Sequence, residues 1–374
     1  MNIAVNTRLL LSNKLEGIGW FTYETLKRIV KIHPEHQFFF LFDRPFSNEF
    51  IFANNVTPIV IPPPARHPIL FYMWFEWSVN KALKKHHIDV FLSPDGYLSL
   101  KTNVPSISVI HDLNFEHYPK DLRWSHSQYY RHYFPKFAKK ASRIATVSLH
   151  SKSDLVKTYN LNASKIDVVY NGANDIYQPI PKHEQLKTRT KWSNGKPYLL
   201  YVGALHKRKN ISRLLLAFDR VAQKHKDLNL LIVGKQMFSD PDMEKTFAAL
   251  ENKNRVVFTN RLSVEDLHHV LASALALVYI PYFEGFGIPV IEAMQCGTPV
   301  ITANCTSLPE VAGEAALLVD PFDVNDITAN MMQLIENEAL QKQLSEAGIK
   351  NAKRFSWDKT AEALWNCIKK VSNE

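Results

Sequence analysis

The sequence has few cysteines and no long hydrophobic run, and each absence excludes a class of protein. Its three cysteines, Cys296, Cys305 and Cys367, have the spacing of neither a disulfide framework nor a metal site, so we expect buried, reduced thiols in a cytosolic protein. No apolar stretch reaches the roughly 18 to 20 residues that a membrane-spanning helix needs. The nearest, 270–280, ends at Pro281. Because the first residues read directly as an apolar strand, we expect no secretory signal.

The composition that remains is that of a globular protein with an uneven charge. The chain has 374 residues, 46% of them hydrophobic and 22% charged, and this length favours two domains over one core. Residues 1–180 hold 21 basic and 14 acidic residues (+7), whereas 181–374 hold 24 and 22 (+2). The basic first half suggests an anionic partner, which could be a nucleic acid, a membrane surface or a phosphorylated substrate. A generic basic protein is the alternative.

Apolar runs of strand length alternate with helical patterns along the chain. We expect strands at 2–6, 37–42, 56–61, 88–93, 105–110, 143–148, 166–170, 197–202, 228–233, 255–258, 275–280, 299–302 and 316–319. We expect helices at 20–32, 69–87, 124–142, 149–159, 243–250, 325–336, 339–355 and 357–371, and others beginning near 211, 264 and 289. This alternation predicts an α/β fold with parallel sheets. Prolines in 178–182 mark a linker, so we expect one domain at 1–178 and another at 182–356.

The most informative stretch follows the apolar run 275–280. Pro281 ends the expected strand, Gly285 and Gly287 allow a tight turn, and Pro289 suits the first turn of a helix. The unpaired amides of such a helix start form an anion site. Two acids flank this site, Glu284 and Glu292, and a carboxylate accepts hydrogen bonds from hydroxyls but repels phosphate. A phosphate site between hydroxyl-binding acids suits a nucleoside diphosphate sugar; two surface or helix-end acids are the alternative.

Glu284 and Glu292, with seven residues between them, resemble the E-x7-E motif of retaining glycosyltransferases of the GT-B fold, family 4. The string Cys296-Gly297-Thr298-Pro299-Val300 resembles the same family. So does Ser307-Leu308-Pro309-Glu310-Val311, which resembles a subgroup rich in mannosyl- and rhamnosyltransferases. The resemblance implies two Rossmann-like parallel-sheet domains that face each other across a cleft. It also implies that the first domain is the acceptor side, that the C-terminal helix, 357–374, completes this domain, and that the second domain binds the nucleotide sugar. The donor would be a nucleotide diphosphate sugar, with no cofactor.

The resemblance also implies roles for individual residues. Arg208 and Lys209 would hold the donor diphosphate, Glu284 the sugar hydroxyls and Glu292 the ribose. Ala204 stands where many members carry arginine, and Arg208 can supply that charge. The expected catalytic residues are His111, Arg208, Lys209 and Glu284. The expected donor-binding residues are Gly17, Gly19, Gly203, Arg208, Lys209, Gly234, Arg261, Leu262, Glu284, Gly285, Phe286, Gly287 and Glu292.

Three of these assignments have structural alternatives. His111 follows the strand 105–110, and ligands of open α/β sheets bind at the carboxyl ends of strands, although a single histidine is often structural. Its neighbour Asp112 could instead cap the next turn. Gly17 and Gly19 precede an expected helix but lack the G-x-G-x-x-G spacing, so a plain turn is the alternative.

We expect no metal site. Asp240-Pro241-Asp242 superficially resembles the D-x-D metal motif, but it directly precedes an expected helix, and an N-cap is the better interpretation. Because Arg208 and Lys209 can neutralise a diphosphate, the reaction would need no divalent ion.

The resemblance implies a retaining hexosyltransferase in cell-surface polysaccharide synthesis. We expect transfer of mannose from GDP-mannose to a glycan acceptor that is lipid-linked. A UDP- or ADP-sugar transferase with a soluble acceptor is the alternative, and a basic nucleic-acid-binding protein is a more remote one. The stretch 123–143 is dense in basic and aromatic residues, which suits an anionic membrane interface or an ordinary buried helix with a basic outer face. We therefore expect a cytoplasmic protein with peripheral membrane contact.

Overall fold

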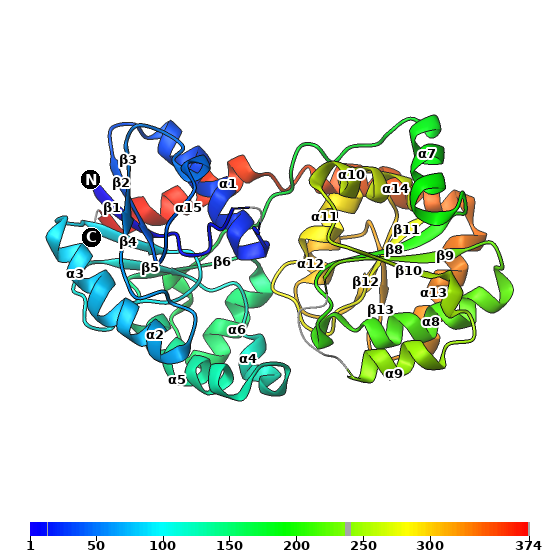
Figure 1. Cartoon of the computed structure of the whole chain (residues 1–374), viewed down its shortest axis with the longest axis horizontal. Coiled ribbons are helices and arrows are strands. Elements are labelled where there is room, and N and C mark those ends of the chain that lie inside the picture. Colours follow the sequence, from blue (N-terminus) through cyan, green and yellow to red (C-terminus); the bar gives the residue numbers. More distant parts are fainter. Residues whose placement is uncertain (13, 236–240, 373–374) are drawn as a thin grey trace. The chain divides into compact units, whose positions relative to one another are not determined.

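The computed structural model describes residues 1–12, 14–235 and 241–372. The chain divides into two compact units. Residues 1–172 and 356–374 form unit 1, and residues 173–355 form unit 2 (Figure 1). The boundary therefore lies a few residues before the expected one at 178, and the C-terminal helix belongs to unit 1.

Unit 1 is built on a seven-stranded parallel sheet in the order β3-β2-β1-β4-β5-β6-β7. Its strands are β1 (Asn2–Asn6), β2 (Gln37–Phe42), β3 (Val56–Val60), β4 (Val90–Ser93), β5 (Ser106–Val109), β6 (Arg143–Thr146) and β7 (Ile166–Val168). The central strands consist almost entirely of buried residues, as expected for a parallel sheet covered on both faces. In the register, Ala4 of β1 pairs with Phe39 of β2 and with Phe91 of β4.

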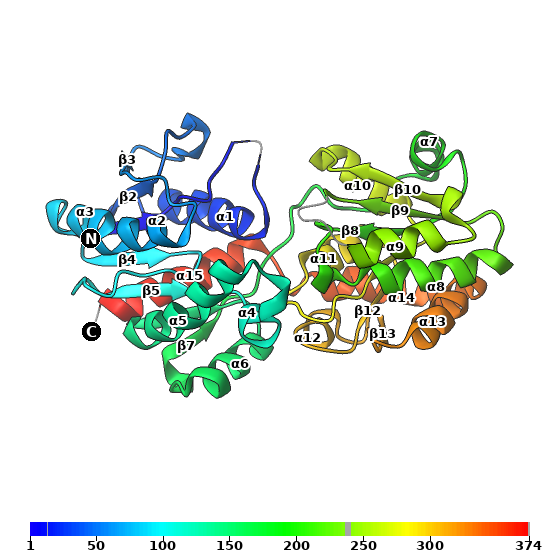
Figure 2. The ribbon, with the colours of Figure 1, turned by 60° about the horizontal axis from the view of Figure 1, so that its bottom comes forward.

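Helices cover both faces of this sheet. The longer ones are α1 (Gly17–Ile32), α2 (Pro68–Met73), α3 (Asn80–Lys85), α5 (Trp124–Lys140), α6 (Leu149–Tyr159) and α15 (Trp357–Ser372). The short ones are η1 (Asn48–Phe50), the π-helical η2 (Trp74–Val79), α4 (Asn114–His117), η3 (Pro119–Asp121) and η4 (Ala163–Lys165). Helix α15 lies against β4, β5 and β6 beside α1, while α5 lies on the other face, against β5 (Figures 1 and 2).

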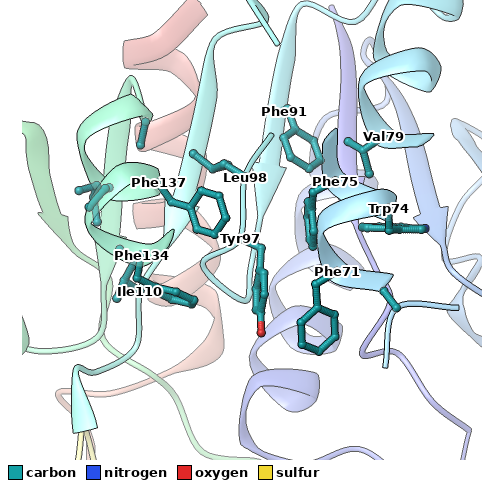
Figure 3. Close-up of a cluster of buried hydrophobic side chains, with 14 of the residues drawn as sticks. Phe71, Trp74, Phe75, Val79, Phe91, Tyr97, Leu98, Ile110, Phe134 and Phe137 are labelled. Atoms are coloured by element: carbon teal, nitrogen blue, oxygen red, sulfur yellow. The ribbon is translucent and has the colours of Figure 1, made fainter. Parts of the chain in front are cut away.

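An aromatic cluster fills the space between the sheet and the helices α2, η2 and α5 (Figure 3). Its centre is Tyr97, in the loop after β4, which stacks on Phe75 at 5.2 Å between ring centroids. Phe71 and Phe134 contact the same ring edge-on at 5.3 Å. The apolar residues of the expected helices 69–87 and 124–142 are thus mainly core residues.

Unit 2 repeats the architecture with a six-stranded parallel sheet in the order β10-β9-β8-β11-β12-β13. Its strands are β8 (Tyr198–Val202), β9 (Asn229–Val233), β10 (Val256–Asn260), β11 (Ala276–Tyr279), β12 (Val300–Ala303) and β13 (Leu317–Val319). Its helices are α7 (Lys182–Ser193), α8 (Ile211–Lys224), α9 (Pro241–Ala249), α10 (Val264–Ser273), α11 (Ile288–Gln295), α12 (Leu308–Ala312), α13 (Val324–Glu336) and α14 (Glu338–Ala352). Single helical turns form η5 (Lys207–Lys209) and η6 (Lys253–Arg255). Helices α8, α9 and α13 cover one face of the sheet, and α7, α10, α11 and α14 cover the other (Figures 1 and 2).

Each sheet reverses its chain order once. The reversal lies between β1 and β4 in unit 1 and between β8 and β11 in unit 2. In open α/β sheets, ligands bind outside the carboxyl ends of the strands at such a reversal. The loops that follow these four strands are therefore where a site is expected in each unit.

Two features differ from the sequence analysis. Gly17 and Gly19 form no turn, because α1 begins at Gly17 and both glycines lie in its first turn. Helix α7 was not predicted, because only Thr188 and Ser193 are buried and it has no apolar stripe. Within the described ranges, no helix is long and apolar enough to cross a membrane.

Candidate active site

The turn after β8 is held rigidly against the end of β11. Gly234, after β9, approaches so closely that a Cβ there would lie 1.8 Å from the carbonyl oxygen of Gly203, so only glycine fits. The buried Asn210 has a left-handed backbone (φ 64°), and its Nδ2 donates to the carbonyl oxygens of Ile280 (3.1 Å) and Pro321 (2.6 Å). These bonds fix the direction of the preceding turn, η5, which carries Arg208 and Lys209.

The turn after β11 leads directly into α11. Gly287 precedes the helix with φ 103°, and a Cβ there would meet Leu308 Cδ2 at 2.7 Å. The Ser307 hydroxyl bridges this turn, because its Oγ lies 2.9 Å from the carbonyl oxygen of Glu284 and 3.1 Å from that of Phe286. The strand, glycine turn and helix start that the sequence predicted are therefore present, and Ser307, directly before α12, holds the turn in place.

The two turns bring two cations and a tyrosine to one carboxylate oxygen. Glu284 Oε2 accepts hydrogen bonds from Arg208 Nη1 (2.8 Å) and the Tyr279 hydroxyl (2.8 Å), and it also pairs with Lys209 Nζ. Lys209 Nζ lies 2.5 Å from the Tyr279 hydroxyl. Arg208 Nη1 additionally donates to the carbonyl oxygen of Phe283 at 3.0 Å. Arg208, Lys209 and Glu284, expected from the sequence, are thus in direct contact.

The charges decide the protonation states of this cluster. Burial alone would raise the pKa of Glu284, but the cations Arg208 and Lys209 outweigh it and lower the pKa to about 2. Burial and the adjacent Glu284 charge raise the pKa of Tyr279 well above its usual value, so the tyrosine remains a proton donor. The side chains of Arg208, Lys209 and Glu284 are 23%, 10% and 13% exposed to solvent. An anion can therefore still reach the two cations.

Glu292, the second acid of the motif, lies in a different environment. It lies on α11, where it is buried and its carboxylate accepts a hydrogen bond from the Tyr177 hydroxyl. Burial raises the pKa of Glu292 to about 7, and the Tyr177 bond only partly opposes this. Burial and the Glu292 charge together raise the pKa of the nearby Cys296 thiol. The two acids of one motif therefore differ in charge near neutral pH.

The other expected donor-binding residues of unit 2 line the same edge of the sheet. Gly203, Gly234 and the pair Arg261 and Leu262 follow the adjacent strands β8, β9 and β10. The Gly203 amide donates to the carbonyl oxygen of Val233 (2.9 Å), and the Gly234 amide to that of Asn260 (3.0 Å). Gly285, Phe286 and Gly287 belong to the turn before α11.

His111, Gly17 and Gly19 lie in unit 1. His111 follows β5, its Nε2 lies 2.8 Å from the carbonyl oxygen of Pro94, and its ring meets Phe21 of α1 edge-on at 5.1 Å. Burial lowers the pKa of His111. A neutral ring that donates from Nε2 has an acceptor lone pair on Nδ1. The neighbouring Asp112 accepts from the Asn114 amide at 3.0 Å, so it caps the next turn, as its alternative interpretation stated.

The expected N-cap Asp240 lies outside the described residues. Asp242 lies in the first turn of α9, where it pairs with Lys207 at 3.1 Å. Among the side chains that the structure describes, no group of three or more His, Cys, Asp or Glu residues could hold a metal ion.

Sequence reasoning missed the residues that support the charged ones. Tyr279 completes the cluster on Glu284, Tyr177 contacts Glu292, and Asn210 and Ser307 hold the two turns. Two of them left a signal in the sequence: Tyr279 is a polar hydroxyl within a buried strand, and Ser307 begins one of the strings that match the family.

Comparisons with known proteins identify the family of this chain. The family described as "Glycosyltransferase Family 4" matches residues 15–175, and "Glycosyl transferases group 1" matches residues 182–351. The O-antigen chain mannosyltransferase B of Escherichia coli is 29% identical over 371 residues, which cover 95% of this chain and 96% of that protein. The O-antigen chain mannosyltransferase RfbU of Salmonella typhimurium is 30% identical over 256 residues, 68% of each chain.

Solved structures show the same fold. The sucrose-phosphate synthase of Thermosynechococcus elongatus has a TM-score of 0.81 at 18% identity, over 99% of this chain and 98% of that one. HepE of Anabaena, in complex with UDP and glucose, has a TM-score of 0.77 at 17% identity, over 98% and 99% of the two chains. The two family matches and the relatives of similar sequence lead to one conclusion: this chain is a glycosyltransferase of the GT-B fold and belongs to glycosyltransferase family 4.

Proposed function

We propose that this glycosyltransferase transfers a hexose to a glycan acceptor with retention of configuration at the anomeric carbon. The hexose that we propose is mannose, and its donor is GDP-mannose. The observation that carries the proposal is the cluster of Arg208, Lys209 and Tyr279 on one oxygen of Glu284, beside the glycine turn that begins α11. Two cations and a helix start suit a diphosphate, and a carboxylate among them suits sugar hydroxyls.

In this proposal, contacts with the donor replace the contacts that Arg208, Lys209 and Glu284 make with one another. Arg208 and Lys209, which neutralise Glu284 in the structure, turn to the diphosphate oxygens. Glu284 then accepts hydrogen bonds from sugar hydroxyls, and Glu292 accepts them from the ribose. The turns after β8, β9 and β10, with Gly203, Gly234, Arg261 and Leu262, hold the base.

The bond from the anomeric carbon to the diphosphate breaks with its electron pair on the leaving oxygen. The acceptor hydroxyl attacks from the same face, and its proton passes to the leaving diphosphate. The negative charge that develops there is stabilised by Arg208, Lys209 and the amides of Phe286 and Gly287, which are fixed before the reaction. His111 would accept a hydrogen bond from a donor hydroxyl through Nδ1. With the protein supplying the cations, the reaction proceeds without a divalent metal.

The choice of mannose and of a polysaccharide pathway rests on the relatives. The two that we compare are mannosyltransferases of the O-antigen chain, and O-antigen is a cell-surface polysaccharide. A lipid-linked acceptor on the cytoplasmic face of the membrane fits the same pathway.

A thermal-shift panel tests the donor. GDP, UDP, ADP and dTDP, each with and without its hexose, are added to the full chain in the presence of EDTA. A ligand at a hundredfold excess over its Kd stabilises the fold by about 2.7 kcal/mol, which raises the melting temperature by roughly 2 to 4 °C for a two-domain protein of this size. We expect GDP-mannose to give the largest shift. A larger shift with a UDP or ADP sugar would replace the donor, and loss of every shift in EDTA would refute metal independence.

A further inference from the structure

The contacts of Glu284 are divided unequally between its two carboxylate oxygens. Arg208 Nη1, Lys209 Nζ and the Tyr279 hydroxyl all contact Oε2. Oε1 makes no hydrogen bond within the described ranges, and the Glu284 side chain is 13% exposed. The carboxylate is therefore fixed through one oxygen, while the other can accept a hydrogen bond from a ligand.

A donor diphosphate would compete with Glu284 for the two cations. In the proposed reaction Arg208 and Lys209 turn to the diphosphate oxygens, so Glu284 loses the charges that neutralise it and faces a second anion. Among the described residues, Tyr279 is then the one partner that Oε2 keeps. Because its hydroxyl is uncharged, the diphosphate draws it away less strongly than it draws the two cations.

Buried neighbours fix the ring of Tyr279. It is the last residue of β11 and is 1% exposed. Its ring stacks on that of Tyr201 of β8, with 6.1 Å between the ring centroids and an interplanar angle of 22°. A Cβ on Gly287, directly before α11, would lie 3.8 Å from Tyr279 Cε1. A ring packed in this way cannot follow a ligand, so the hydroxyl stays beside Glu284.

The Tyr279 hydroxyl takes part in two hydrogen bonds at once. It donates to Glu284 Oε2 at 2.8 Å, and it accepts from Lys209 Nζ at 2.5 Å. Burial and the charge of Glu284 raise the pKa of Tyr279 well above its usual value, so the hydroxyl keeps the proton that it donates. Since the ammonium of Lys209 only donates, the single phenol proton goes to Glu284. One hydroxyl therefore sets the position of both the carboxylate and the ammonium.

We propose that Tyr279 is a positioning residue of the transfer reaction. Its hydroxyl holds Glu284 through Oε2 while a donor diphosphate draws Arg208 and Lys209 away, and this presents Oε1 to a hydroxyl of the donor hexose. The inference rests on the proposed function, because it concerns how the same site holds the donor sugar. Tyr279 does not touch the sugar and acts through Glu284. Its bond to Lys209 also limits the movement of that lysine, since an ammonium can donate to the phenol oxygen and to a diphosphate oxygen together.

Titration calorimetry of the full chain with GDP and with GDP-mannose tests this role; UDP and UDP-glucose replace them if the thermal-shift panel prefers uridine. The ratio of the two dissociation constants, compared between variants, follows the contribution of the sugar, because both probes contain the nucleoside and the diphosphate. The variant is Tyr279→Phe, which removes the hydroxyl and keeps the ring. The matched control is Tyr198→Phe, at the first residue of β8 and so at the opposite edge of the sheet, where the buried hydroxyl donates to the Val270 carbonyl oxygen at 2.7 Å.

We expect Tyr279→Phe to weaken GDP-mannose relative to GDP about fivefold or more, as for a lost hydrogen bond to a charged group, while the affinity for GDP itself changes about threefold at most. Tyr198→Phe should lower the melting temperature and leave both affinities unchanged. In a Glu284→Ala background, Tyr279→Phe should change the ratio about twofold at most, because Tyr279 acts through the carboxylate that this background lacks. Melting curves confirm that each variant is folded.

Three results would overturn the positioning role of Tyr279. They are an unchanged ratio in Tyr279→Phe, an equal weakening of GDP and GDP-mannose, and an effect of Tyr279→Phe that is as large in Glu284→Ala as in the wild type. Failure of both nucleotides to bind the wild type would instead refute the proposed function, on which this role depends.

Discussion

At the scale of residues, the main finding is that one motif places two identical side chains in opposite electrostatic states. Glu284 faces two cations and its pKa falls to about 2, whereas burial beside Tyr177 and Cys296 raises the pKa of Glu292 to about 7. Burial acts in the same direction on both acids, so the difference comes from the cations. The motif predicts which acids matter, but their charges depend on neighbours from distant strands.

The cluster on Glu284 predicts a separation of binding from turnover. Glu284→Gln removes the charge that holds Arg208 and Lys209, so both cations are freer to bind a diphosphate. We expect the affinity for a nucleoside diphosphate without sugar to stay equal or rise. Turnover should fall tenfold or more, because a charged hydrogen bond to the sugar contributes roughly 1.5–3 kcal/mol.

Titration calorimetry and steady-state kinetics measure these two quantities, and a melting curve confirms that the variant is folded. Unchanged turnover, or a nucleoside diphosphate affinity that falls with it, would contradict the role given to Glu284.

Glu292 predicts a stability that depends on pH. Its folded pKa of about 7 exceeds the ordinary 4.5, so the folded chain binds this proton more tightly than the unfolded chain does. That stabilisation is complete below about pH 4.5 and is lost as the pH rises through 7. Glu292→Gln cannot titrate and still accepts from Tyr177, so it should match the wild type at pH 5 and exceed it at pH 8 by roughly 1–3 kcal/mol. Equal differences in melting temperature at both pH values would show that Glu292 is not buried as described.

The sequence predicted the charged site residues but not those that hold them. Glu284, Glu292, Arg208 and Lys209 stand in recognisable strings, because spacing along the chain determines which residues share a turn. Tyr177 contacts Glu292 from more than a hundred positions away, and nothing local indicates that contact. The contacts of the Arg8 guanidinium with the rings of Phe71 and Tyr97 were likewise not predictable, because they join the loops after β1 and β4 to helix α2.

At the scale of elements, the strands were predictable and the helices less so. Every expected strand is present, because a strand buried on both faces reads as a continuous apolar run. Helix α7 was missed because it has no apolar stripe and buries only Thr188 and Ser193, and the expected helix 69–87 contains the π-helical η2. Glu76 within η2 is buried and accepts from the amides of Leu100 (2.8 Å) and Lys101 (3.1 Å). A buried acid that serves a distant loop cannot be inferred from helical periodicity.

The chain returns to unit 1 directly before α15, where it packs against Gly172, so we expect this glycine not to tolerate a side chain. A Cβ on Gly172 would lie 2.3 Å from the Trp357 amide nitrogen and 2.6 Å from the Ser356 carbonyl carbon, both backbone atoms that cannot move cheaply. We expect Gly172→Ala to destabilise unit 1 by about 1–3 kcal/mol, the usual cost of overpacking.

Gly17→Ala is the matched control, because its Cβ would meet nothing within 4 Å and alanine favours the helix that begins there. Chemical denaturation of both variants measures the effect. Equal free energies of unfolding for the two variants would contradict the close packing of Gly172 against Ser356 and Trp357.

At the scale of the whole molecule, each unit has a parallel sheet with one reversal of strand order. In each unit an ion pair joins the loops after the two strands at the reversal, Arg8–Asp95 in unit 1 and Lys209–Glu284 in unit 2. The charge does not follow this symmetry, since residues 1–180 carry +7 and 181–374 carry +2. Unit 1 also exposes large apolar side chains on α2, η2 and α5, with Ile69 at 65%, Trp77 at 54% and Trp124 at 77%. Aromatic residues beside basic ones suit the interface of an anionic membrane.

This surface predicts reversible binding to anionic vesicles. Each basic residue near such a surface contributes about 1 kcal/mol, an attraction that salt screens. We expect flotation with phosphatidylserine vesicles at low salt, less at high salt, and weakening by Trp124→Ser. Equal recovery with neutral and anionic vesicles would favour a soluble acceptor.

The central claim is that the turn carrying Arg208 and Lys209 holds the donor diphosphate, and titration calorimetry of the best nucleoside diphosphate tests it most directly. The turn provides its own control: Lys207 and Lys209 are both lysines of η5, but Lys209 contacts Glu284 and Tyr279, whereas Lys207 pairs with Asp242 and is 60% exposed. We predict that Lys209→Ala weakens binding tenfold or more, as expected for a lost charged hydrogen bond, while Lys207→Ala changes it less than threefold, as for a surface ion pair. Equal losses in the two variants would mean that the turn attracts the nucleotide only through its net charge, and wild-type affinity in Lys209→Ala would contradict the account.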